Sequence, residues 1–177
     1  LECLAAAHAG PEATRPGLAD VPGEGWSQLV GWTPAAWVPA ATRFFESDDP
    51  DAPRVLVGTR ALLGEGWDAR RVTGVVDLTS ATTSTAVVQT RGRALRLDPT
   101  TPDKVAVNWT VTCVFGRNPQ GGSDYARCVA KHAGWFGVDD SGAVIEGIAH
   151  CDATLSPHRA PAAADLDALH VRALVRA

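Results

Sequence analysis

Two short groups of residues have side chains and backbone suited to binding phosphates. In the first group, Gly58-Thr59 is followed after six residues by Gly66 and, two further on, by Asp68. A glycine lets the backbone approach a ligand closely, and a threonine adds a hydroxyl and a main-chain N–H that suit a phosphate oxygen. Taken alone, this glycine-rich stretch is also typical of a structural loop between two strands.

The second group contains two arginines and a glutamine at helical spacing. Gln89, Arg93 and Arg96 are separated by four and then three residues, which predicts a stripe on one face of a helix. Gly92 costs a helix roughly 1 kcal/mol relative to alanine, so we expect something to pack closely there. A row of arginines aimed at one point is what neutralising a triphosphate requires. The alternative is a solvated basic helix face.

Together the two patterns, G-T-x6-G-x-D and Q-x-x-G-R-x-x-R, resemble motifs V and VI of superfamily 2 helicases. These proteins are nucleic-acid-dependent ATPases, and both motifs lie on the second of their two RecA-like domains. The resemblance covers residues 43–98, and it is closer to the restriction-motor and DNA-repair branches than to RNA-type members. It implies that the nucleic-acid backbone is contacted by Gly58, Thr59, Arg60 and Arg43.

The same resemblance implies roles at an ATP site. Gly66, Asp68 and Gln89 would lie on the nucleotide side, with the carboxylate accepting a hydrogen bond from a ribose hydroxyl. Arg93 and Arg96 would be catalytic arginine fingers that reach ATP bound on the other RecA-like domain. One position departs from the common pattern, because Thr90 stands where many members have an arginine.

The chain lacks the residues that would hold the triphosphate itself. A P-loop ends in Gly-Lys-Ser/Thr, whereas Lys104 precedes Val105 and Lys131 precedes His132. No acidic D-E-x-H box for magnesium is present either. We therefore expect ATP and Mg²⁺ to be bound mainly by an N-terminal RecA-like domain of the same polypeptide, and this chain alone to be inactive. The absence of methionine also suggests a piece of a longer protein.

Composition limits the other possibilities. The 177 residues carry a formal charge of −4, and no apolar run could span a bilayer. A local arginine cluster can still hold phosphates on an acidic protein, so DNA, or RNA, remains the expected partner. Four widely spaced cysteines without a secretory signal indicate reduced thiols in the cytoplasm.

The expected fold is α/β: a RecA-like, mostly parallel sheet with flanking helices over residues 33–117. A loop-rich segment, 1–32, precedes it, and a small α+β extension of unknown role, 118–177, follows it. Strands are predicted at 54–58, 72–78 and 105–115, the last from its period of two, with one strongly buried face. Helices are predicted at 35–47, 82–97, 124–136 and 165–177, and a hairpin at 138–150.

Two further groups of residues have side chains that could form sites. Cys128, His132, His150 and Cys151 could form a Cys2His2 zinc site, but adjacent residues 150 and 151 would point to opposite sides of a strand, so we expect no metal site. The tryptophans could stack on bases, although core packing or a partner-domain surface is favoured: Trp26, Trp32 and Trp37.

A function from a different class would fit the same fold. The chain could be a non-catalytic nucleic-acid-binding or protein-docking module that keeps the helicase fold without a working motor. A P-loop and an acidic box upstream of Leu1 would favour the motor, and their absence would favour the module.

Overall fold

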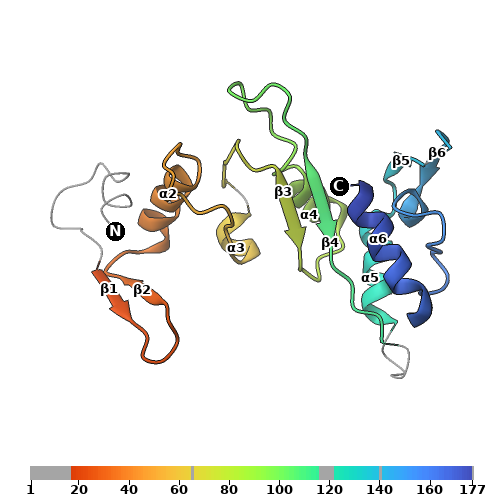
Figure 1. The fold of residues 1–177 in the computed structure, drawn as a ribbon, viewed down its shortest axis with the longest axis horizontal. Coiled ribbons are helices and arrows are strands. Elements are labelled where there is room, and N and C mark those ends of the chain that lie inside the picture. The colour runs from red at the N-terminus through yellow and green to blue at the C-terminus, as the bar shows by residue number, and fades with distance from the viewer. Residues whose placement is uncertain (1–16, 65, 116–121, 140, 177) are drawn as a thin grey trace. The chain divides into compact units, whose positions relative to one another are not determined.

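The computed structural model describes residues 17–64, 66–115, 122–139 and 141–176. The chain divides into two compact units, Leu1–Arg71 and Val72–Ala177, and each is described by itself. Figure 1 shows the order of helices and strands along the chain. Within the described ranges, no helix is both long enough and apolar enough to cross a membrane.

The first unit contains a hairpin where the sequence suggested a loop. Strands β1 (Gly17–Asp20) and β2 (Ser27–Val30) pair antiparallel, and the Ser27 hydroxyl donates to Asp20 Oδ1 over 2.7 Å. The prediction of a loop-rich segment was wrong for residues 17–30. Gly23 and Gly25 belong to the turn between the strands, where their φ angles are +80° and +69°. Residues 1–16 lie outside the described ranges.

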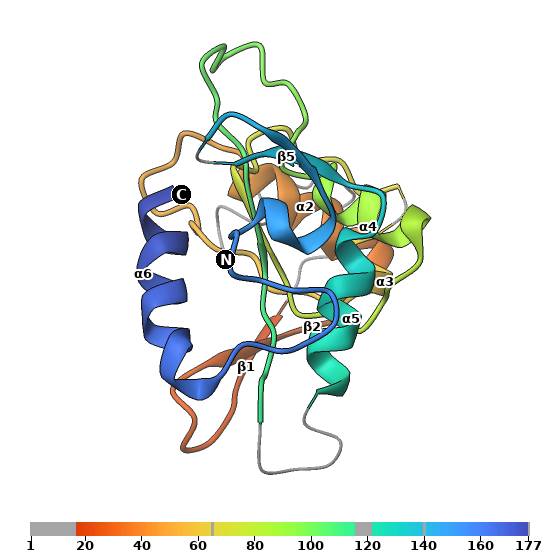
Figure 2. The ribbon, with the colours of Figure 1, turned by 90° about the vertical axis from the view of Figure 1, so that its right-hand side faces the viewer.

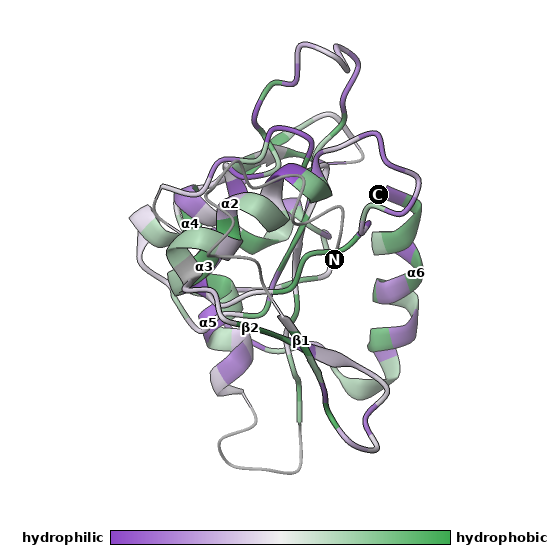
Figure 3. Cartoon of the chain, turned by 90° about the vertical axis from the view of Figure 1, so that its left-hand side faces the viewer, coloured by the Kyte–Doolittle hydropathy of each residue, from purple (hydrophilic) through white to green (hydrophobic). Residues whose placement is uncertain are grey.

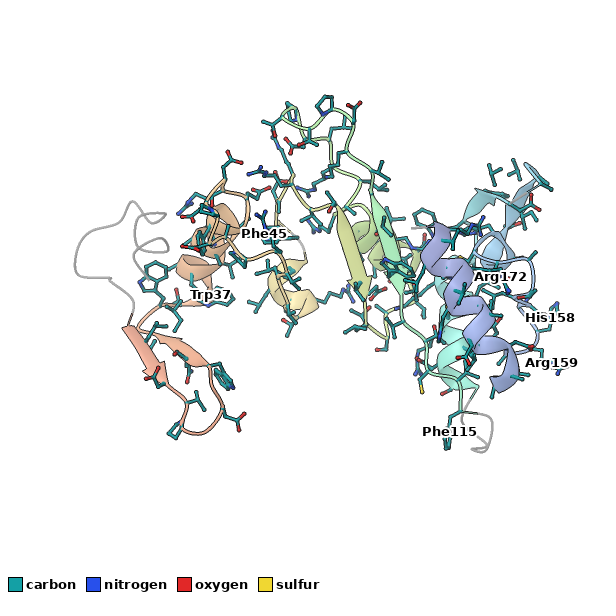
Figure 4. The ribbon with its side chains drawn as sticks, viewed as in Figure 1. Trp37, Phe45, Phe115, His158, Arg159 and Arg172 are labelled. Atoms are coloured by element: carbon teal, nitrogen blue, oxygen red, sulfur yellow. The ribbon has the colours of Figure 1, made fainter. Side chains whose placement is uncertain are left out.

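Helix α2 (Pro34–Phe45) confirms the helix predicted after Thr33. Thr33 is extended at the N-cap, with proline at the start of the helix, where the missing N–H costs no hydrogen bond. Pro39 lies inside α2 and does not end it. Trp37 and Phe45 extend from this helix (Figure 4).

The segment after α2 differs from the prediction. No strand forms over residues 54–58, and Val57 is 88% exposed. A short apolar run becomes a strand only when a neighbour satisfies its backbone groups, and no described strand pairs with this run. The short helix α3 (Arg60–Leu63) follows it directly.

The loop after α3 is attached to the C-terminal half of α2 and the turn beyond it. Trp67 Nε1 donates to Thr42 Oγ1 over 2.8 Å. Arg71 pairs with Asp48 over 2.7 Å, and its backbone N–H donates to Glu46 Oε1 over 3.0 Å. These contacts join residues more than twenty positions apart and fix the loop that carries Gly66.

The second unit begins with a strand, helix, strand arrangement, as predicted. Strands β3 (Gly74–Asp77) and β4 (Val107–Thr110) pair in parallel, with Val76 opposite Trp109. Helix α4 (Ser84–Arg91) lies between them in sequence and buries Ala86 and Val87. Parallel strands require a crossover connection, which this helix supplies. The three sheets of the described chain have two strands each, and this is the parallel one.

The strand predicted over residues 105–115 is shorter in the structure. Only the four residues of β4 pair with β3, because β3 itself is four residues long. The predicted burial of one whole face was wrong, since Val105 is 74% exposed and Val111, Cys113 and Phe115 are exposed as well.

The rest of the second unit packs around a small core. Helix α5 (Ser123–His132) contributes Tyr125 and Cys128, and the 3-10 turn η2 (Gly147–His150) contributes Ile148. Figure 2 shows α5 and η2 close together. The Tyr125 hydroxyl donates to the Ser156 carbonyl over 2.7 Å, which attaches the following loop to this core.

The predicted hairpin and C-terminal helix are confirmed. Strands β5 (Phe136–Val138) and β6 (Val144–Glu146) pair antiparallel, and Asp139 Oδ1 accepts from the backbone N–H of Ala143 over 2.9 Å. After the 3-10 turn η3 (Ala163–Asp165), helix α6 (Leu166–Arg176) closes the described chain. Figure 3 shows hydrophobic and hydrophilic residues alternating along α6.

The contact between α6 and residue 152 predicts a pH dependence. Arg172, labelled in Figure 4, donates to Asp152 Oδ2 over 2.5 Å and lowers the pKa of Asp152 from 3.8 to about 2. The Asp152 carboxyl is a stronger acid in the folded than in the unfolded protein. Its contribution to the free energy of unfolding is therefore complete above pH 3.8 and is lost as the pH falls toward 2.

We expect Arg172→Ala to cost about 1–2 kcal/mol near neutral pH, a value reduced because Arg172 is partly exposed. As the pH falls from 3.8 toward 2, the free energy of unfolding of the variant should also decrease less than that of the wild type. Urea unfolding at a series of pH values measures both effects. An unchanged acid profile in Arg172→Ala would contradict this assignment.

Candidate functional site

The first unit has an open pocket beside α2 and the loop after α3. Its volume is about 560 Å³, within the range of small-molecule sites. Three of the residues predicted to contact nucleic acid or nucleotide line it together: Arg43, Gly66 and Asp68. The structure therefore brings a guanidinium, a carboxylate and a glycine backbone to one cavity.

The pocket has an apolar wall and a charged rim. The apolar side comes from α2 and α3, through Val38, Pro39, Ala61 and Leu62. Glu46 adds a second carboxylate, and Trp67 also lines the cavity. Gly66 has a φ of +80°, a conformation that favours glycine and turns the chain between Trp67 and α3. Such a cavity can hold a flat apolar group while polar atoms at its edge select the orientation.

The other residues of the first motif lie next to this pocket without lining it. Thr59 is the N-cap of α3, and its carbonyl accepts from the backbone N–H groups of Leu62 and Leu63. A side chain at Gly58 would meet Leu63 Cδ1 at 2.6 Å, which explains the glycine by local packing. Gly58, Thr59 and Arg60 are all exposed, so they are open to a large ligand.

The second motif lies in the second unit, where the predicted helical stripe was wrong. Helix α4 ends at Arg91, so Gln89 is helical while Arg93 and Arg96 are not. The chain continues in turns, in which Arg93 N–H donates to the Thr90 carbonyl over 3.2 Å. Gln89 is exposed, Arg96 is half-buried, and Arg93 is 8% exposed.

The atoms nearest to Gly92 belong to its own helix, so the structure does not show the predicted close packing of another group there. A Cβ at this position would lie 2.9 Å from the Val88 carbonyl oxygen. The Gly92 N–H donates to that same oxygen over 2.9 Å. The backbone of Gly92 is right-handed, with φ −60° and ψ −16°, and its contact with a carbonyl of the same helix does not identify a ligand.

A buried ion pair was not foreseen from the sequence. Lys131 Nζ on α5 lies 2.8 Å from Asp77 Oδ2 at the end of β3, and it also donates to the Thr79 carbonyl. Burial alone would raise the pKa of Asp77, but hydrogen bonds from Lys131 and Thr79 hold it below its usual value. The sequence does show an acidic residue, Asp77, at the end of a predicted strand. Its partner Lys131 is 54 positions away, so the sequence does not indicate the pair.

A second unforeseen group gathers histidines and cysteines. The ligand atoms of His132, His150 and Cys151 lie within 4.8 Å of one another. The prediction that residues 150 and 151 point apart was wrong, because His150 ends a 3-10 turn and neither residue is in a strand. The sequence patterns C-x3-H and H-C contain these metal-binding residue types. The predicted strand conformation at residues 150 and 151 was what led away from a metal site.

Burial dominates the acid–base properties of this group. It lowers the pKa of His132 to about 4 and raises the pKa of Cys151 to about 11, so both are neutral near pH 7. The nearby Arg91 guanidinium lies 4.5 Å from the centre of the Trp135 ring, a cation–π contact. The positive charge of Arg91 adds to the lowering of the His132 pKa, whereas it partly opposes the effect of burial on the Cys151 pKa.

Comparison with known proteins adds no assignment, since no family model, curated protein or solved structure matches this chain.

Proposed function

We propose that the chain is the C-terminal motor domain of an ATP-dependent nucleic-acid helicase or translocase that acts on DNA. The observation that carries this proposal is the pair of motifs, from Gly58 to Asp68 and from Gln89 to Arg96, in the order that superfamily 2 helicases share. The proposal includes a RecA-like domain as its fold, an N-terminal RecA-like partner domain on the same polypeptide, and a cytoplasmic location.

Several structural features support this proposal. Gly66 and Asp68, the two residues of the first motif that are assigned to the nucleotide, line one pocket together. The β3–α4–β4 arrangement is the unit from which parallel α/β sheets are built. The cysteines Cys113, Cys128 and Cys151 are free thiols, in keeping with a reducing compartment.

The proposed chemistry divides the ATP site between two domains. The N-terminal domain would hold the triphosphate and Mg²⁺, which neutralise and orient the transferred phosphoryl group. This chain would supply Asp68 and Gln89 to the nucleotide, and Arg93 and Arg96 to the charge that develops on the phosphate. Thr59, Arg60 and Arg43 would contact the nucleic-acid backbone, and motion between the domains would produce a step.

One observation favours the second candidate, a binding module without a motor. Arg93 is 8% exposed, as an arginine with a structural role would be. In that case the exposed Thr59 and Arg60 would still bind nucleic acid, but no ATP would be turned over.

The test measures ATP hydrolysis by the full-length protein with and without DNA. The motor proposal expects DNA to raise turnover, and expects residues 1–177 alone to show none. DNA binding by the full-length protein with no ATP hydrolysis would exclude the motor and favour the binding module. RNA in place of DNA checks the choice of nucleic acid.

A further inference from the structure

The second unit brings His132, His150 and Cys151 into metal-ligand spacing. Their ligand atoms all lie within 4.8 Å of one another, and Cys151 Sγ is 3.5 Å from His150 Nε2. Zinc bonds of about 2.3 Å to sulfur and 2.0 Å to nitrogen, meeting at a tetrahedral angle, place those two atoms about 3.5 Å apart. One edge of a zinc tetrahedron is therefore already formed.

The backbone explains why adjacent residues can converge. His150 ends the 3-10 turn η2, and the Cys151 N–H donates to the Ile148 carbonyl over 3.0 Å. In this tight turn successive side chains need not alternate between two faces, as they would in a strand. His132 is the last residue of α5, which packs against η2.

His132 is oriented in the manner of metal-binding histidines. Its Nδ1 lies 2.8 Å from the Cys128 carbonyl oxygen, which can only accept, so Nδ1 carries the proton. The Nε2 lone pair is then left for another partner. A hydrogen bond from one ring nitrogen to a backbone carbonyl commonly fixes the tautomer of a ligating histidine.

His150 lacks partners that its burial should require. Its Nδ1 is buried with no hydrogen-bond partner in the described structure, and its Nε2 has only the weak thiol contact. The ring is also closely enclosed, because a Cβ at Gly137 would lie 2.7 Å from His150 Cδ2. Nε2 is the nitrogen beside the Cys151 sulfur, so it is the His150 atom placed to bind a metal ion, and an ion there would not supply a partner for Nδ1.

We propose that His132, His150 and Cys151 bind one Zn²⁺ ion, with a fourth position open to water. Two imidazoles and a thiolate suit zinc better than magnesium or calcium, which prefer oxygen. The Cys151 thiol releases its proton to solvent as the sulfur–zinc bond forms. Cys128 is not a ligand, because its Sγ lies 3.9 Å from His132 Nδ1, the nitrogen already bonded to a carbonyl.

The ion would join segments that are distant in sequence. It would connect the end of α5 to the turn after η2, whose carbonyls at His150 and Cys151 accept from Arg176 Nη1 on α6. Zinc would thus stabilise the packing of α5, η2 and α6 on one another. This site does not depend on the proposed motor activity.

The test uses the purified chain, stripped of metal and titrated with Zn²⁺ alone or with Co²⁺ as a spectroscopic substitute. We expect one equivalent to bind, with the visible bands of tetrahedral Co²⁺ and a thiolate-to-cobalt charge-transfer band. At a free zinc concentration about 100 times Kd, the ratio of folded to unfolded protein should rise about 100-fold. Failure to bind one equivalent, or a cobalt spectrum without the charge-transfer band, would overturn the proposal.

Two matched cysteine variants assign the sulfur ligand. Cys151→Ser should remove the charge-transfer band and weaken zinc binding on the order of 100-fold. Cys128→Ala removes a buried thiol on the same helix as His132. This variant should keep both the charge-transfer band and the affinity for zinc. A band that survives Cys151→Ser, or one that disappears in Cys128→Ala, would overturn the three-ligand site. The wild-type cobalt spectrum decides the matter even where a variant does not fold.

Discussion

Arg93→Ala is expected to reduce DNA-stimulated ATP hydrolysis by the full-length protein by about 10³ to 10⁵-fold. The effect follows from the proposed role of Arg93 as an arginine finger, since a guanidinium aimed at the transferred phosphoryl group stabilises the charge that develops in the transition state. ADP binding should persist, because the missing interaction acts mainly on the transition state. Steady-state turnover and ADP affinity are the two measurements.

The burial of Arg93 requires controls for folding. Arg93 is 8% exposed, so its removal could lower stability as well as turnover. Urea unfolding of the variant separates the two effects, and Arg96→Ala tests a half-buried member of the same motif. Arg127→Ala removes an arginine that pairs with Asp124 on the surface of α5, and it should leave turnover within about two-fold. Normal turnover in a folded Arg93→Ala protein would remove the arginine-finger assignment.

Local patterns predicted the elements whose signals are contained within a few residues. Thr33-Pro34 marked the start of α2, and the Asp139 turn marked the β5–β6 hairpin, because capping and turn chemistry depend on neighbours in sequence. The strand, helix, strand order around α4 was predicted for the same reason. The position of Gly66 and Asp68 on one loop followed directly from their spacing.

Features that depend on distant partners could not be predicted in this way. Residues 54–58 have a strand-like composition, yet no described strand pairs with them. Helix α4 ends at Arg91, which separates Arg93 and Arg96 from the helix. To predict that His132 and Cys151 lie close together, one would have to know that a 3-10 turn, and not a strand, precedes residue 151. The pairing of strands and the backbone conformation between motifs depend on tertiary structure, whereas the spacing of a motif can be read from the sequence.

The second large effect is expected at the buried ion pair. Asp77→Ala should lower the free energy of unfolding by about 3–5 kcal/mol, because it leaves the Lys131 ammonium buried without a counter-charge. The side chains of Lys131 and Asp77 are only 4% and 10% exposed. The Thr79 carbonyl still accepts from Lys131, but a carbonyl does not neutralise its charge. Urea unfolding at neutral pH measures the loss.

Two controls distinguish the pair from ordinary packing. Replacing both partners, as Asp77→Leu with Lys131→Met, should be far less costly than Asp77→Ala, because no buried charge remains. Arg127→Ala breaks an ion pair on the same helix whose arginine is 43% exposed, and it should cost only about 0.5 kcal/mol. A double variant as unstable as Asp77→Ala would show that shape, and not charge, matters at this position.

The sign of the pH dependence provides a sharper test than the size of the loss. In the wild type the pKa of Asp77 lies below its usual value of 3.8, so the contribution of this group is complete above that pH and is lost as the pH falls through the lowered value. Lys131→Met removes the main hydrogen bond that offsets burial, so burial should raise the pKa of Asp77 above 3.8. A raised pKa stabilises the fold only at low pH. Acidification toward pH 3.8 should therefore stabilise Lys131→Met relative to wild type, and parallel pH profiles would show that the two charges do not interact.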